Sequence, residues 1–363
     1  MGWWRVDADT LAGSRFVVSP LAETVAALKT LHRGAGAHPG ERRWLASALP
    51  RYLDLLAGDP VTAALVRTAL RPRWNATFLT PTPGAATGPA GDGGALFARE
   101  LAEVRATPPA VVRADLVESL GSDAALPPSL RRREDLAERA AELLSRVWTD
   151  TVEPDWARRR RIIEADVLAR TVRLGSGGWA QALDGLRPGM RWLGGDRLRI
   201  GGAPSNEPSN VPSDEPRDEP RELAAAELLF VPVTPAQSWL CWDVPAVGGR
   251  REHAGRRYAV VYPCSGVLAD ETRRPVPKAL AALLGPGRAE LLTLLDTPKT
   301  TSQLVVLTGL PLGSVGRHLR ILREAGLTLR RRAGRSVLYH RTPAGQVLLD
   351  AVPPGAQVHP VGS

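Results

Sequence analysis

The stretch from residue 301 to residue 341 constrains the fold most, because it carries two short helical patterns and then two alternating strands. The spacing of apolar residues predicts a helix, a turn, a second helix and a hairpin, at residues 301–308, 309–311, 312–325, 327–331 and 336–341. Gly326 supplies the left-handed residue that ends the second helix. Two helices joined by a tight turn and followed by a hairpin predict a helix-turn-helix with a β wing.

Positive charge is concentrated on the same segment. Residues 285–345 contain ten basic and three acidic residues, a net charge of +7, whereas the whole chain carries +9. The basic residues are Arg288, Lys299, Arg317, Arg320, Arg323, Arg330, Arg331, Arg332, Arg335 and Arg341. Since the chain has three lysines, arginine is its ordinary basic residue, and the clustering rather than the abundance is the evidence. Clustered positive charge indicates a phosphate backbone as partner.

The second predicted helix has one apolar and one basic face. Val315, Leu319 and Leu322 share the apolar face, and small residues near the start of the opposite face permit close approach to a major groove. His318 lies about 60° from the apolar face, so packing is the alternative to a phosphate contact there. The predicted DNA contacts are Thr301, Gly313, Ser314, Arg317, His318, Arg320, Arg331, Arg332 and Arg335.

These residues resemble the winged helix of ArsR-type bacterial transcriptional regulators. The family pattern LSxxTVSxHLxxLxxAGL corresponds to residues 310–327, and the wing pattern RxGRxxxYxxT corresponds to residues 332–335 with Tyr339 and Thr342. SRFVVSPLAETVAALKTL, ELAEVRATPP and the helix near Asp155 are similar to an N-terminal domain of unassigned function in actinobacterial regulators. The resemblance implies operator DNA as partner and a homodimer that pairs through the first and last helices of the winged domain, here 277–284 and 343–351.

The chain departs from the family pattern at several positions. Pro311 replaces the usual serine N-cap of the recognition helix, which costs about 0.5–2 kcal/mol, and Gly313 and Gly316 weaken the helix further. We therefore expect altered or weakened sequence specificity. Metal-sensing members carry a cysteine pair in the helix before the turn, and residues 301–308 contain none, so we expect neither a metal nor another cofactor.

The N-terminal part contains the larger core, because all ten tryptophans precede residue 250. Apolar spacing predicts helices at residues 19–31, 41–56, 96–106, 109–120, 130–149 and 155–174. Alternation predicts strands at residues 197–200, 228–233, 239–244 and 258–262. The predicted class is α+β, with a mostly helical N-terminal domain that has a small β-rich part, followed by a C-terminal winged helix-turn-helix. A tryptophan-lined effector pocket is the alternative to a purely structural role for these aromatic residues.

Composition divides the chain into two domains. The polar, proline-rich sequence ETRRPVP marks a boundary, so we expect an N-terminal domain at residues 1–270 and the winged domain at 271–363. Proline recurs every four residues from Pro204 to Pro220. Because the intervening residues are mostly polar, we predict a disordered insert at residues 203–222.

Other classes of protein lack support. No apolar stretch suits a signal peptide or a bilayer span, which favours a cytoplasmic protein without a membrane partner. Gly175–Gly178 follows a predicted helix rather than a strand, so we expect a helix-terminal loop there and not a dinucleotide site. Glu164 and Asp166 do not face each other on a helix, and no catalytic triad is evident, so the sequence favours no enzyme. We expect the run Arg158–Arg161 to form a solvated helix face, with nucleic-acid binding as the alternative.

The sequence thus predicts a homodimeric, DNA-binding transcriptional regulator, with double-stranded DNA contacted by residues 312–325 and an arginine-rich wing at 327–341. The N-terminal domain is expected to serve dimerisation, sensing of an unidentified small-molecule effector, or both. The alternative is an adaptor whose winged helix binds another protein and not DNA.

Overall fold

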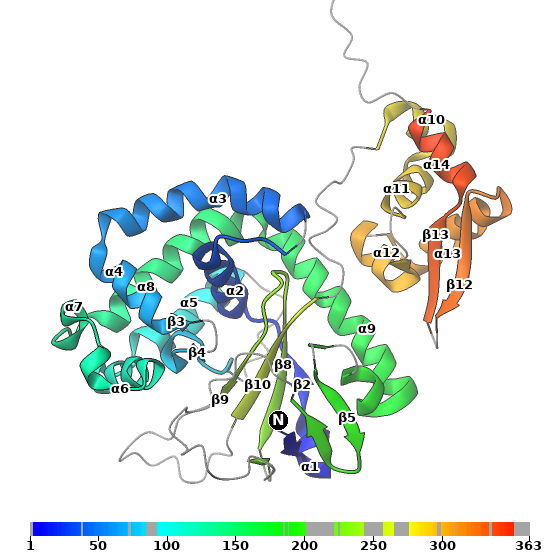
Figure 1. Ribbon diagram of the computed structural model, residues 1–363. Helices are drawn as coiled ribbons and strands as arrows, with labels where there is room; N and C mark the ends of the chain where they lie inside the picture. Colours follow the sequence, from blue (N-terminus) through cyan, green and yellow to red (C-terminus); the bar gives the residue numbers. More distant parts are fainter. Residues whose placement is uncertain are drawn as a thin grey trace, which may run out of the picture. The chain divides into compact units, whose positions relative to one another are not determined.

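The computed structural model describes residues 3–351, except 38, 72–73, 85–92, 184–185, 188, 201–220, 224–225, 243–256, 265–275, 296–298, 309 and 334–335. The chain divides into two compact units, Met1–Ala269 and Asp270–Ser363 (Figure 1). The predicted insert at 203–222 lies outside the described residues, apart from Arg221 and Glu222, which form a short strand.

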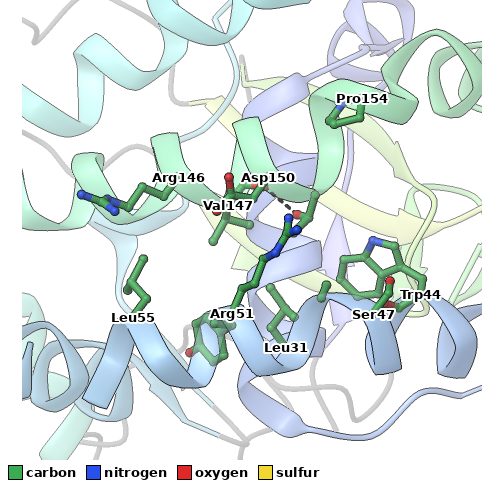
Figure 2. A pocket seen from close by; sticks show the side chains of 12 residues that line it. Leu31, Trp44, Ser47, Arg51, Leu55, Arg146, Val147, Asp150 and Pro154 are labelled. Atoms are coloured by element: carbon green, nitrogen blue, oxygen red, sulfur yellow. Dashed lines mark hydrogen bonds between the residues drawn. The ribbon is translucent and has the colours of Figure 1, made fainter. Parts of the chain in front are cut away.

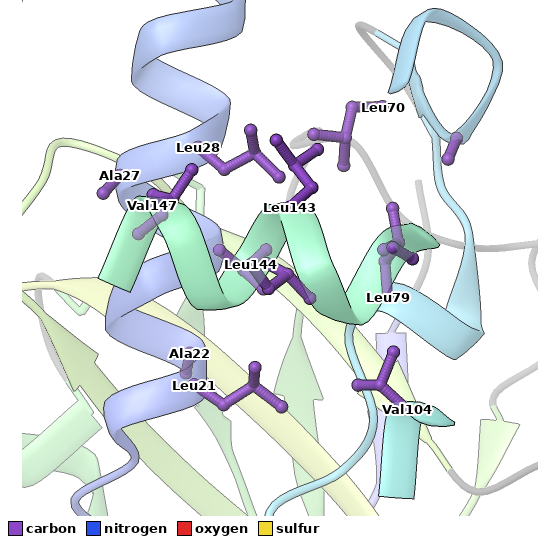
Figure 3. Packing of buried hydrophobic residues seen from close by; sticks show 14 of the residues in the cluster. Leu21, Ala22, Ala27, Leu28, Leu70, Leu79, Val104, Leu143, Leu144 and Val147 are labelled. Atoms are coloured by element: carbon purple, nitrogen blue, oxygen red, sulfur yellow. The ribbon is translucent and has the colours of Figure 1, made fainter. Parts of the chain in front are cut away.

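Helices form most of the first unit. They are α1 (Ala8–Gly13), α2 (Pro20–Arg33), α3 (Pro39–Gly58), α4 (Pro60–Ala69), α5 (Gly93–Arg105), α6 (Pro109–Leu120), α7 (Pro128–Arg131), α8 (Leu136–Val147) and α9 (Trp156–Leu183). α2 begins as predicted: the Ser19 hydroxyl accepts a hydrogen bond from the amide of Ala22, and Pro20 occupies the first turn. α2 is central to the helical core, where Leu21 and Leu28 pack with Leu144 and Val147 of α8 (Figure 3).

A sheet of order β2-β8-β10-β9 forms the centre of this unit. Its strands are β2 (Arg15–Phe16), β8 (Glu227–Val233), β9 (Trp239–Trp242) and β10 (Arg257–Pro263). Successive side chains point to opposite faces, so Leu229 and Val231 join the helical core, whereas Leu228 and Phe230 join a second core. Both faces are covered, which explains the continuous apolar run of β8.

The second core is closed by another sheet, of order β5-β6-β1-β7. Its strands are β1 (Trp3–Arg5), β5 (Arg191–Gly194), β6 (Arg197–Arg199) and β7 (Arg221–Glu222), and a separate small pair is formed by β3 (Leu70–Arg71) and β4 (Trp74–Asn75). Trp4 is 2% exposed in this core and its ring lies 5.7 Å from that of Tyr258. The first strand of the chain is therefore held by strands nearly 200 residues away.

The predicted helix at 130–149 was wrong. The chain instead forms α7, breaks over Arg132–Asp135, forms α8, and ends in the π-helical turn η3 (Trp148–Val152) and the 3-10 turn η4 (Glu153–Asp155). The predicted loop at Gly175–Gly178 was also wrong, because Gly175 to Gly177 are helical and only Gly178, with φ of 67°, interrupts α9, which consists of two helical stretches on either side of it. Glycine permits this left-handed conformation inside the helical segment.

Arg159 contradicts the prediction of a solvated face for Arg158–Arg161. Its side chain is 1% exposed and donates to Glu23 at 2.6 Å and to the hydroxyl of Thr234 at 3.0 Å. Glu23 is fully buried and also accepts the amide of Thr234 at 2.7 Å. This paired charge links α2 and α9 to the end of β8, because neither charge would be tolerated alone in the interior.

The second unit is a winged helix-turn-helix. Its elements are α10 (Lys278–Leu284), α11 (Pro286–Leu294), β11 (Lys299–Thr300), α12 (Thr301–Thr308), α13 (Leu312–Glu324), β12 (Thr328–Ala333), β13 (Ser336–Arg341) and α14 (Pro343–Asp350). The three strands have the order β11-β13-β12. The predicted α+β class, with a mainly helical N-terminal body and a C-terminal winged helix-turn-helix, is confirmed.

Candidate nucleic-acid interface

The helix α13 is fixed to the second unit by its apolar face. Val315, Leu319 and Leu322 are at most 1% exposed and pack with Leu291 of α11 and Leu304 of α12. The spacing of these three residues follows the period of the helix, so one side of α13 is buried against the core of the second unit. The opposite side is thereby held toward solvent on a rigid support.

The two ends of α13 are capped unequally. Pro311 precedes the helix and provides no side-chain cap, as its lack of a side-chain oxygen predicts. At the other end Gly326 has φ of 69°, and the amide of Leu327 donates to the carbonyl of Leu322 at 2.9 Å. This six-to-one hydrogen bond terminates the helix and directs the chain into the wing.

The solvent side of α13 carries small and basic residues. Gly313, Gly316, Arg317 and Arg320 are exposed, and Ser314 is half-buried at the flank. Arg320 is 64% exposed and lies 3.9 Å from Glu324, which is 63% exposed, so this pair is weak. The predicted contact residues Gly313, Arg317 and Arg320 therefore share one accessible face of α13.

His318 packs toward the core. The side chain is half-buried, and a Cβ added to Gly287 of α11 would lie 3.1 Å from its Nε2 atom. Its Nδ1 atom is buried and has no hydrogen-bond partner among the described residues. The imidazole is thus wedged against α11, which favours the packing alternative over a phosphate contact.

The wing is a six-pair antiparallel hairpin in which Thr328 faces Arg341 and Ala333 faces Ser336. Arg330 and Arg331 of β12 are exposed. Arg332 belongs to the same strand, whereas Arg335 lies outside the described residues. Two exposed cations in succession suit contacts with phosphates, which require charge and not a particular base.

Three members of the basic set are partly or fully buried and bind other parts of the fold. Arg341 donates to the carbonyls of Leu292 and Thr293 at 3.1 and 3.0 Å and to the side chain of Gln346 at 2.6 Å. Lys299 is 5% exposed in β11, and Arg288 donates to the carbonyl of Leu284. Counting charges along the sequence therefore overestimated the charge that faces a partner.

The helix before the turn resembles a support more than a contact surface. Thr301 begins α12 and is half-exposed, and Leu304 is fully buried.

Cys241 and Cys264 are buried in the first unit. Within the described residues, no cluster of three or more histidine, cysteine or acidic side chains is placed to hold a metal ion. The same residues include no helix long and apolar enough to cross a membrane.

Comparison with known proteins agrees with this geometry. A family model described as "Bacterial regulatory protein, arsR family" matches residues 285–327. The HTH-type transcriptional regulator NmtR of Mycobacterium tuberculosis (strain ATCC 25618 / H37Rv) is 33% identical over 98 residues, which are 26% of this chain and 82% of NmtR. No solved structure matches the chain. The chain therefore belongs to the ArsR family of bacterial regulatory proteins, the DNA-binding helix-turn-helix transcriptional regulators.

Proposed function

We propose that this protein regulates transcription by placing α13 in the major groove of double-stranded operator DNA while the β12–β13 wing contacts the flanking phosphates. The observation that carries the proposal is that α13 has one buried apolar face and one exposed face with small and basic residues. Its apolar residues are sealed in the core, and Gly313, Arg317 and Arg320 are exposed together on the other side. A helix with small residues near its start and arginines beyond it suits entry into a groove about 12 Å wide.

We assign the larger unit to dimerisation and to sensing of a small-molecule effector, and the operator-bound form to a homodimer. A single recognition helix contacts few base pairs, whereas a two-fold dimer doubles the contacts. We infer a regulator rather than an enzyme, acting in the cytoplasm, where operator DNA is accessible. NmtR, which is similar to 26% of this chain, is named a transcriptional regulator, and this supports the same role here.

A salt titration of DNA binding tests the proposal. Five arginines are exposed on the two elements: Arg317, Arg320, Arg323, Arg330 and Arg331. If each copy neutralises about five phosphates, log K against log[salt] should have a slope of about −4 to −5 per bound copy, or roughly −9 for the dimer. An adaptor that binds another protein through this unit would show no DNA binding. Specific binding with a slope near zero would contradict the phosphate contacts.

A further inference from the structure

The first unit contains a pocket that the family assignment does not explain. It has a volume of about 240 Å³ and lies between α3 and the segment formed by the end of α8 and η3 (Figure 2). All twelve lining residues belong to the first unit. The volume is slightly below the roughly 300–1,000 Å³ of sites for drug-sized ligands, so the space suits a smaller molecule.

The inner wall of the pocket is apolar and rigid. Leu31, Tyr52 and Val147 are at most 5% exposed and belong to the helical core. Trp44 is half-buried and forms one end of the pocket (Figure 2). An apolar wall that has a flat aromatic side chain at one end favours a ligand with a compact apolar or aromatic body.

The rim of the pocket carries charges that are not used by the fold. Arg51, Arg146 and Asp150 are exposed, and none of the three makes a hydrogen bond or an ion pair within the described part of the chain. Figure 2 shows Arg51 reaching from α3 across the pocket toward η3, with Arg146 at the end near Leu55. Two cations against one carboxylate leave the rim positive, which complements an anionic group.

The outer wall is a π-helical turn. η3 supplies Asp150 and Thr151 to the lining, between α8 and the start of α9. Single π turns inside helical segments cost regular hydrogen bonds and are frequent at functional sites. The turn here widens the helix where the pocket needs its polar residues.

We propose that this pocket binds a small organic anion, with its carboxylate held by Arg51 and its apolar body packed against Trp44 and Tyr52, while Arg146 adds positive charge at the other end of the rim. This rests on the effector-sensing role assigned above to the first unit. Asp150 accepts a hydrogen bond from a donor group on the ligand body. The ligand class is an aromatic or branched aliphatic carboxylate of fragment size.

The pocket is joined to the buried charge pair of the unit. The guanidinium carbon of Arg159 lies over the face of the Trp44 ring at one end of the pocket, 5.5 Å from the centre of the ring. Arg159 in turn holds Glu23 of α2 and Thr234 after β8. A ligand that moves Trp44 therefore acts on the ion pair that connects α2, α9 and the central sheet.

Calorimetric titration of the full chain with phenylacetate tests the site, with phenylacetamide as the neutral probe of the same shape. Phenylacetate should bind saturably and at least about tenfold more tightly than the amide, since a charge-assisted hydrogen bond contributes that much. Arg51→Gln should weaken phenylacetate binding by about tenfold or more. Arg43→Gln, also exposed on α3 but outside the lining, should leave it unchanged. Ser47→Trp, at an exposed lining position, should block the pocket without disturbing the core.

Three outcomes overturn the proposal: no saturable binding of phenylacetate, equal affinity for acid and amide, or equal effects of Arg51→Gln and Arg43→Gln. Melting curves of each variant identify a folding defect, and Ser47→Trp then provides the independent result. Operator binding is measured on the same samples without the probe. If the protein binds DNA but not phenylacetate, only the proposed ligand site is refuted. If it binds phenylacetate but not DNA, the proposed DNA-binding function is refuted and the ligand site is retained.

Discussion

We propose Arg317 as the residue that distinguishes one DNA sequence from another. It lies on the exposed face of α13, one turn after Gly313, and has no acidic partner within the described residues. Its guanidinium is therefore free to contact a guanine edge with two hydrogen bonds. We predict that Arg317→Ala weakens operator binding by about 1–3 kcal/mol while affecting random DNA less.

Arg331→Ala is the matched control for this variant. Arg331 is exposed on the wing, where phosphate contact is expected, so its loss should weaken operator and random DNA about equally. Gel-shift titrations with both DNAs, at one stated salt concentration, measure the difference. Identical specificity losses in the two variants would refute the division of roles between α13 and the wing.

Arg341 connects several elements of the second unit through its hydrogen bonds. It joins β13 to the end of α11 through two backbone carbonyls and to α14 through Gln346. We predict that Arg341→Leu lowers the free energy of unfolding by about 1.5–3 kcal/mol, because hydrogen bonds from a charged group are lost and the carbonyls are left unpaired. Arg331→Leu, a surface change, should stay within about 0.5 kcal/mol. Chemical denaturation of both variants gives the comparison, and equal stabilities would contradict the role of Arg341.

The arginines also show what the sequence leaves undecided at this scale. Arg341 and Arg317 are the same residue type in the same basic cluster, but one is satisfied by carbonyls of α11 and the other faces solvent. Arg159 is buried beside Glu23, although 136 positions separate them. Which acceptor meets a guanidinium depends on long-range packing, and one sequence carries no direct signal of that packing.

Between elements, Glu100 ties α5 to the start of α2. Its carboxylate accepts the amide of Leu21 at 2.9 Å and the hydroxyl of Ser19 at 3.1 Å. Burial raises the pKa of Glu100 from 4.5 to about 7, and burial likewise raises the pKa of Asp115 to about 6. Above pH 4.5 the unfolded chain therefore releases a proton that the folded protein still holds, so stability falls as pH rises toward 7.

We predict that Glu100→Gln flattens this pH dependence. The wild-type free energy of unfolding should decrease by up to roughly 3 kcal/mol from Glu100 alone as the pH rises from about 4.5 to 7. The amide has no such proton to lose, so its slope should be smaller, with the contribution of Asp115 remaining. Melting temperatures at pH 5 and pH 8 measure both slopes. The same slope in both proteins would show that Glu100 is ionised throughout.

The ends of the proline-rich insert can be joined by a short loop. β6 and β7 flank β1, and β6 is antiparallel to β1 whereas β7 is parallel to it. The end of β6 and the start of β7 therefore lie at the same end of the sheet, beside the start of β1, and are two strand spacings or about 10 Å apart. The four residues 200–203 can extend over about 13 Å, which is sufficient.

We predict that deletion of residues 204–220 leaves the melting temperature and the DNA affinity nearly unchanged, because the cost of loop closure varies slowly with length. A variant with glycine and serine in place of these seventeen residues keeps the length and serves as control. A fall of more than a few degrees in both variants would show that the native segment packs against the fold.

Elements with a local start signal were predicted well. α2 begins at the predicted serine cap, and α6 has the predicted bounds at Pro109 and Leu120. The break between α7 and α8 was missed because residues 130–149 keep helical spacing throughout. A tryptophan-lined pocket was an alternative from the sequence, but its place could not be predicted, since the walls come from α3 and η3, about 100 positions apart.

For the whole molecule, the second unit offers two exposed apolar side chains through which we propose that two copies pair. Leu283 of α10 and Val347 of α14 are 68% and 67% exposed, whereas Leu280 and Leu349 on the same helices are buried in its core. These first and last helices are the ones through which ArsR-type dimers are expected to pair. Each is short, at seven and eight residues, so their contact surface is small. A stable interface buries roughly 1,200–2,000 Å², which requires a contribution from the larger unit.

We therefore predict that the full chain is a homodimer and that residues 271–363 alone are monomeric or dimerise weakly. Light scattering of both proteins measures this. Leu283→Glu and Val347→Glu should weaken the dimer, because each places a charge in an apolar contact. Leu329→Glu, at a wing position that is 50% exposed, should leave the dimer intact and is the control. A monomeric full chain that still binds one operator site tightly would overturn the dimer. A stably dimeric fragment would instead assign the whole interface to α10 and α14, and the larger unit would then be left with effector sensing as its role.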